Sequence, residues 1–185
     1  MIYLCSDWHF SHNKDFLYAP RGFTSIEEMN AAIIENHNKI VSAEDDVYVL
    51  GDCCMGDSSL LDLNKSYIES LNGKLHIVTG NHCTNKKIEL YSNCKNVVEI
   101  KECAMLLKYK KYHFYLSHYP TMTSNLDIDK PLYARVINLC GHSHTKDKFE
   151  DFKKRLGLIY HVEMDAHENK PVSIDNIIED IKSVI

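Results

Sequence analysis

The chain has 185 residues, of which 44% are hydrophobic and 25% are charged, values typical of a folded protein that exclude a disordered one. This length suits one domain over residues 1–185 that can bury a core without a disulfide scaffold. The formal net charge of −5 makes long nucleic acid an unsuitable partner, because that affinity requires Lys and Arg to neutralise phosphates.

The sequence shows no sign of membrane insertion or export. No apolar stretch approaches the ~18 residues of a membrane span, and Met1 leads directly into a predicted strand instead of a basic and then apolar leader. We therefore expect no membrane partner and a cytoplasmic location. The seven cysteines form no C-x-x-C pair, so we interpret them as reduced thiols that are mostly buried.

The first half of the chain alternates between predicted strands and helices. Ser25 and Glu28 have the spacing of a capping box, and Met29, Ile33 and Ile40 lie on one face of the helix that follows. A second helix, from about Ser59 to Leu71, precedes the helix-terminating Gly73. Three strands are predicted in this half: Ile2–Ser6, Asp46–Leu50 and Lys74–Thr79.

The second half continues the pattern after a short helical piece. The stretches "ECAMLLKY" and "YHFYLS" predict a hairpin, and "KYKKY" between them indicates a solvated tip better than a phosphate-binding patch. A further strand is predicted over Arg135–Cys140, and "SIDNIIEDIKSVI" predicts an amphipathic terminal helix. With no linker or repeat between these elements, the sequence predicts one α/β domain.

Polar residues follow five of the predicted strands. Each residue alone is compatible with a core histidine or a simple turn, but their coincidence at five strand ends is not. Because sites assemble at the carboxyl ends of strands, we expect these side chains to meet at one edge. Their nitrogen and oxygen atoms suit zinc, manganese or iron. The residues are Asp7, His9, Asp52, Asn81, His118, His142 and His144.

Local backbone features support this convergence. A glycine precedes Asp52, Asn81 and His142, and we expect each glycine to let the backbone turn sharply toward a shared centre. In an extended segment, the spacing of His142 and His144 would place both imidazoles on the same side.

The ordered series D-x-H, GD, GNH, H and GHSH, from Asp7 to His144, resembles the calcineurin-like metallophosphoesterase superfamily. The stretches "DWHFSH", "LSHYP" and "KPVSIDNI" also resemble a small bacterial and phage branch of predicted phosphoesterases. The resemblance implies an α/β fold, a two-sheet β-sandwich flanked by helices in four α-β-β-α layers.

The resemblance further implies two divalent or transition-metal ions, with manganese favoured over iron or zinc. An attacking hydroxide would bridge the ions and displace the leaving group in line. His82 would be catalytic, stabilising charge on the phosphate and protonating the leaving oxygen. Asp7, His9 and His144 would hold the first ion, Asn81, His118 and His142 the second, and Asp52 would bridge the two.

The third block departs from the family pattern, because Cys83 stands where a carboxylate is usual. Another group must then orient His82. Asp57 is one candidate, although it is equally well placed to cap a surface helix near Ser58.

Two further residues near the motifs have two interpretations each. His12 is positioned for a substrate contact or is a solvated loop histidine, and Arg21 either contacts a phosphate bidentately or belongs to the loop before a helix. Cys53 and Cys54 follow the bridging aspartate, and we expect packing residues there, not ligands.

The predicted function is hydrolysis of phosphodiesters or phosphomonoesters of small or nucleotide-like substrates by a dinuclear metal centre. Two alternatives remain open, a non-catalytic metal-binding interaction module that retains the fold, and a nuclease. The sequence fixes neither the substrate nor the oligomeric state.

Overall fold

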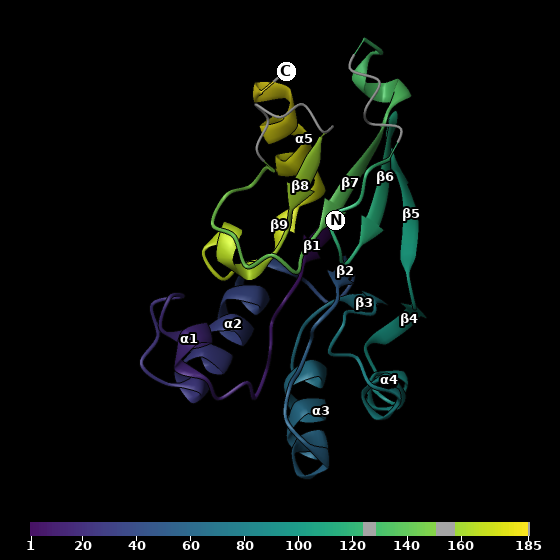
Figure 1. Ribbon diagram of the computed structural model, residues 1–185. Coiled ribbons are helices and arrows are strands. Elements are labelled where there is room, and N and C mark those ends of the chain that lie inside the picture. Colours follow the sequence, from purple (N-terminus) through teal and green to yellow (C-terminus); the bar gives the residue numbers. More distant parts are fainter. Residues whose placement is uncertain (124–128, 151–157, 185) are drawn as a thin grey trace.

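The computed structural model describes residues 1–123, 129–150 and 158–184, which form two β-sheets with helices (Figure 1). The first sheet has the order β4-β3-β2-β1-β9 and contains β1 (Ile2–Cys5), β2 (Asp46–Leu50), β3 (Lys74–Val78), β4 (Val97–Lys101) and β9 (Val172–Ser173). The second has the order β5-β6-β7-β8 and contains β5 (Ala104–Tyr109), β6 (Tyr112–Ser117), β7 (Val136–Cys140) and β8 (Ile159–His161). The helices are α1 (Asp15–Tyr18), α2 (Ile26–Ile40), α3 (Leu61–Glu69), α4 (Asn85–Ser92) and α5 (Ile174–Ser183).

Most neighbouring strands are parallel. β1, β2, β3 and β4 run in one direction, with β9 antiparallel to β1 at the edge. In the second sheet β6, β7 and β8 are parallel, and β5 is the antiparallel partner of β6. The carboxyl ends of β1, β2 and β3 therefore lie at one edge of the first sheet, as those of β6 and β7 do in the second.

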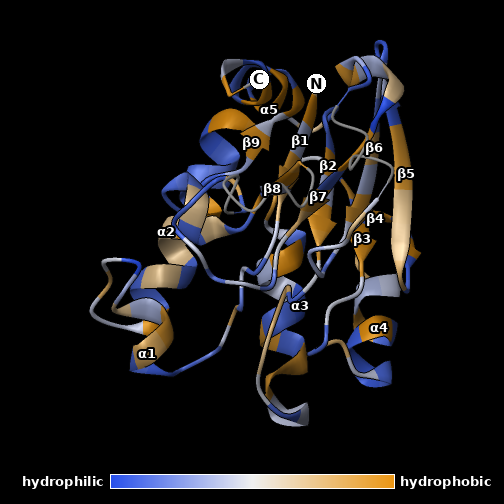
Figure 2. Cartoon of the chain, turned by 45° about the horizontal axis from the view of Figure 1, so that its top comes forward, coloured by the Kyte–Doolittle hydropathy of each residue, from blue (hydrophilic) through white to orange (hydrophobic). Residues whose placement is uncertain are grey.

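Alternation along the strands divides the hydrophobic core into two clusters. Tyr3 and Cys5 belong to the cluster that the first sheet shares with α2, α3 and α4, whereas Leu4 belongs to the cluster it shares with the second sheet. The apolar face of α5 joins this second cluster through Ile177 and Ile181. Figure 2 shows helices that are hydrophobic on one side and hydrophilic on the other. No helix among the described residues has the length and hydropathy of a membrane span.

The predicted fold class, two sheets with flanking helices, is confirmed. Ser25 caps α2 by accepting from the Glu28 amide, and Lys110 occupies the tip of the β5–β6 hairpin. The helix predicted from Ser59 begins instead as a 3-10 turn, Ser58–Leu60, that leads into α3. The predicted terminal helix ends at Ser183, and its last residue, Ile185, lies outside the described residues.

The cysteines have the predicted character. All seven are free thiols, and five are buried. Cys53 and Cys54 lie in the hydrophobic cluster that the first sheet shares with α2, α3 and α4, which confirms their packing role.

Candidate metal centre

The loop after β1 runs beside the loop after β2. The amide of Asp7 donates to the Gly51 carbonyl (3.1 Å) and that of His9 to the Asp52 carbonyl (3.0 Å). Trp8 and Phe10 alternate with these residues and are fully buried in the core. The sequence "DWHF" therefore anchors the loop through its aromatic residues, and this anchoring holds Asp7 and His9 at the sheet edge.

Five of the seven predicted ligands have a left-handed backbone. Their φ angles lie between +50° and +76°, a region that few residues other than glycine adopt, and they are Asp7, His9, Asp52, His142 and His144. Each such residue costs about 1–3 kcal/mol, and such residues cluster at functional sites. The predicted extended segment around His142 and His144 is wrong, because both residues have positive φ and their imidazoles diverge into two groups.

The three glycines that precede ligands are required for different structural reasons. Gly51 has a φ of +96°, as a sharp turn requires. Gly80 and Gly141 do not have positive φ angles, but a Cβ on Gly80 would overlap the Asp52 carboxylate, and one on Gly141 would overlap Ser6 and the Asp7 carboxylate. At these two positions the glycine is explained by close approach and not by the predicted turn.

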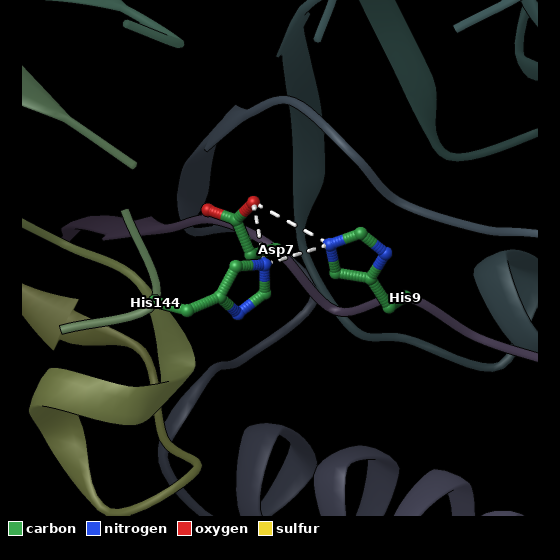
Figure 3. Close-up of side chains that lie close together, drawn as sticks. All are labelled: Asp7, His9 and His144. Atoms are coloured by element: carbon green, nitrogen blue, oxygen red, sulfur yellow. Dashed lines mark hydrogen bonds and ion pairs between the residues drawn. The ribbon is translucent and has the colours of Figure 1, made fainter. Parts of the chain in front are cut away.

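Asp7, His9 and His144 form the first group of side chains (Figure 3). The Nε2 atoms of His9 and His144 are 3.2 Å apart, and the Asp7 Oδ1 atom lies 3.6 Å and 3.8 Å from them. Asp7 Oδ1 is buried without a hydrogen-bond partner in the described part of the chain. An unpartnered buried carboxylate oxygen that faces two imidazole nitrogens is a donor set that fits a metal ion.

Asp52, Asn81, His118 and His142 form the second group. His118 Nε2 lies 3.4 Å from Asp52 Oδ2 and 2.9 Å from Asn81 Oδ1, and His142 Nδ1 lies 3.0 Å from that amide oxygen. His118 Nδ1 donates to the Leu50 carbonyl (2.8 Å), which fixes the ring so that Nε2 faces the group. These oxygen and nitrogen donors also fit a metal ion.

The two groups are adjacent. Asp52 Oδ2 is 3.9 Å from His9 Nε2 in the first group and 3.4 Å from His118 Nε2 in the second. Asp7, Asp52 and His118 also bring three donor atoms within 4.8 Å of one another. The structure thus brings all seven predicted ligands together, with Asp52 between the two groups.

Charge complementarity keeps the central carboxylates ionised. Burial alone would raise the pKa of Asp7, but its interaction with His9 and the positive charge of the neighbouring histidines lower that pKa to about 2. Burial likewise opposes ionisation of Asp52, and His118 lowers its pKa below the usual range. Two ionised carboxylates among imidazoles make a site suited to a cation.

His82 lies at the edge of this cluster. Its amide donates to Asp52 Oδ1 (3.0 Å), its carbonyl accepts from Lys87 Nζ (2.9 Å), and its ring lies edge-on to that of His9 at 5.7 Å. Asp57 instead caps the 3-10 turn by accepting from Ser59. The backbone contacts and the His9 ring therefore position His82, with no carboxylate at the Cys83 position.

The sequence interpretation missed Asp165. It follows β8, accepts from His144 Nδ1 (3.0 Å), and pairs with the Arg21 guanidinium through two contacts of 2.7 and 3.0 Å. A carboxylate on the second imidazole nitrogen is the usual device that orients a metal-ligating histidine. Asp165 is thus the bidentate partner of Arg21 in the structure, and a phosphate contact by Arg21 stays a prediction. The rule of polar residues at strand ends would have found Asp165 if the three-residue β8 had been predicted.

An open cavity of about 580 Å³ lies over the cluster. His82 and His12 line it together with five of the predicted ligands. Burial and the neighbouring imidazoles lower the pKa of His12 to about 4, so this side chain is neutral at pH 7. The apolar part of the cavity wall consists of Phe16, Leu17, Pro20 and Met55.

The profile of the calcineurin-like phosphoesterase superfamily domain matches residues 1–160. The chain belongs to this superfamily. An uncharacterised protein of Methanocaldococcus jannaschii, MJ1445, is 29% identical over 178 residues, which cover 96% of this chain and 89% of that protein.

Two solved structures are similar to this chain. A protein of unknown function from Aquifex aeolicus, AQ665, aligns with a TM-score of 0.73 at 22% identity over 97% of this chain and 98% of the other, a likeness that shows a shared fold. A novel archaeal phosphodiesterase aligns with a TM-score of 0.47 at 18% identity, over 90% and 86% of the two chains. Membership of the superfamily implies metal-dependent hydrolysis of phosphoesters.

Proposed function

We propose that this protein is a dinuclear metal-dependent phosphoesterase that acts on small or nucleotide-like phosphoesters, with manganese as the favoured metal. The observation that supports it most strongly is the convergence of seven nitrogen- and oxygen-donating side chains, two of which are buried carboxylates, beneath an open cavity. Asp7, His9 and His144 would hold one ion, Asn81, His118 and His142 the other, and Asp52 both.

A pair of bound divalent ions would supply Lewis acidity toward the phosphoryl oxygens and would lower the pKa of an attacking water. Asp52 suits the shared position because its Oδ2 atom lies between the two groups, 3.9 Å from His9 Nε2 in one and 3.4 Å from His118 Nε2 in the other. The His118–Leu50 and His144–Asp165 hydrogen bonds hold one ligand of each group in the required tautomer. The cavity would hold the ester over the donor atoms.

His82 is the proposed catalytic residue. Its imidazole lines the cavity and belongs to neither of the two groups of metal-ligating side chains. There it would stabilise charge on the phosphoryl group and donate a proton to the leaving oxygen. An alkoxide leaving group needs such a proton, whereas a nitrophenolate departs without one.

A metal-reconstituted substrate panel tests the proposal. The panel contains nitrophenyl phosphodiesters and phosphomonoesters, cyclic nucleotides and dinucleotides. We expect hydrolysis of a nitrophenyl phosphodiester with manganese and its loss after chelation. His118→Asn should slow the hydrolysis of every reactive substrate together, because it removes a metal ligand. Complete inertness of folded, metal-loaded protein toward all members would contradict the proposal and support the non-catalytic binding module.

A further inference from the structure

Part of the cavity wall is apolar. Phe16, on the short helix α1, leaves 70% of its surface exposed although it is one of the largest hydrophobic side chains of the chain. Leu17, Pro20 and Met55 line the cavity beside it. Because this exposed ring lines the cavity, a ligand in the cavity would cover it.

A polar group accompanies this aromatic ring. The His12 imidazole lies edge-on to Phe16, with 5.7 Å between ring centroids, and its other neighbour is the His9 ring at 5.2 Å. His12 Nδ1 is buried and has no hydrogen-bond partner among the residues that the structure describes. The rings of His9, His12 and Phe16 thus follow one another along the cavity, from a predicted metal ligand to an apolar ring.

We propose that Phe16 and its apolar neighbours bind the base of a nucleotide-like substrate whose phosphate lies over the metal ligands. This inference rests on the proposed function and names its substrate class. A base offers a flat face that can stack on Phe16 and a polar edge that can bond to His12, whereas an alkyl group offers only apolar surface. Continuity of the apolar wall with the metal ligands in one cavity places this organic group beside the phosphate.

Calorimetric binding to manganese-loaded protein tests the inference without turnover. The probes are the phosphonate analogues of AMP and of ribose 5-phosphate, whose C–P bonds resist hydrolysis. Stacking of a base on an aromatic ring contributes ~1–3 kcal/mol, so wild type should bind the adenosine compound about 5- to 150-fold more tightly. Phe16→Ala should remove that preference and leave the ribose compound unchanged, while Phe16→Trp should retain it.

Two further variants sharpen the comparison. Leu106→Ala removes an exposed apolar side chain on β5 (79% exposed) and should change neither affinity. Tyr119, half exposed and 4.7 Å from the His142 ring, is the rival aromatic surface. Equal binding of the two probes to wild type, equal weakening of both by Phe16→Ala, or loss of the base preference through Tyr119→Ala instead would overturn the inference. A base preference in protein that hydrolyses nothing would support it and contradict only the proposed function.

Discussion

Asp165→Asn should weaken both the fold and the metal centre, for two separable reasons. Asp165 and Arg21 leave only 8% and 1% of their side chains exposed. Burial opposes ionisation of Asp165, but His144 and Arg21 hold its pKa far below the usual range, so it carries a full charge at pH 7. The substitution leaves the Arg21 guanidinium buried without its counter-charge. Removing one partner of a buried pair costs about 3–5 kcal/mol.

The second effect acts through His144. Asp165 accepts from Nδ1 of that imidazole, which directs Nε2 toward Asp7 and His9. Loss of such an orienting partner weakens metal binding by about 10- to 100-fold. Urea unfolding of chelated protein measures the first effect, and calorimetric titration of folded protein with Mn²⁺ at pH 7 measures the second.

Asp175→Asn is the matched control. Asp175 pairs with Lys110 on the surface, where the two side chains are 41% and 61% exposed, so its loss should cost at most about 1 kcal/mol and leave metal affinity unchanged. If Asp165→Asn destabilised the fold but bound Mn²⁺ like wild type, the pair would be purely structural and the orienting role would be refuted.

Three other substitutions test separate parts of the site and the core. Burial, partly offset by a hydrogen bond to the Asn72 carbonyl, lowers the pKa of His37 to about 4, so the stability it confers is present above pH ~6.5 and lost as the pH falls toward 4. Urea titrations of chelated wild type and His37→Gln should therefore differ by an amount that changes by about 3 kcal/mol over that range, and a constant difference would contradict the burial argument. Gly141→Ala should lower metal affinity at least about tenfold, because the added Cβ would displace Asp7. Gly22→Ala is strained by a φ of +91° but has open space for a Cβ, so it should lower stability alone. His82→Asn should keep the metal content and slow a nucleotide-like ester ~100 to 10,000-fold more than a nitrophenyl ester; equal slowing of both, or loss of a metal ion, would remove the leaving-group role.

The sequence predicted the elements whose patterns are long or bounded by clear signals. In the structure Ser25 caps α2, and β5 and β6 pair as an antiparallel hairpin. The apolar runs of β1, β2 and β3 contribute residues to the core. Strands β4, β8 and β9 were not predicted, and β4, although it has five residues, has no buried residue to mark it. β8 and β9 have three and two residues, too few for a periodicity, and their pairing is imposed by neighbouring strands rather than by local preference.

The site was predictable to the extent that its residues follow strands. All seven ligands do, because strand ends are where the sheets deliver side chains to a shared edge. Asp165 was not predicted because β8 was not. Its pairing with Arg21 could not be predicted either, since a pair separated by 144 residues leaves no local trace in the sequence. The roles of Gly80 and Gly141 could be assigned only from the three-dimensional structure, because in a sequence a glycine required by the close approach of two loops looks the same as one required by a turn.

The metal content of the reconstituted protein tests the central claim most directly. Purified chain should be loaded with Mn²⁺, dialysed and subjected to elemental analysis, beside Asp52→Asn and the control Asp57→Asn, whose side chain caps an exposed turn. We expect close to two ions per chain in wild type and in Asp57→Asn, and loss of both ions in Asp52→Asn because the bridge is shared. Hydrolytically active wild type without bound metal, or Asp52→Asn that retains both ions, would contradict the proposed dinuclear centre.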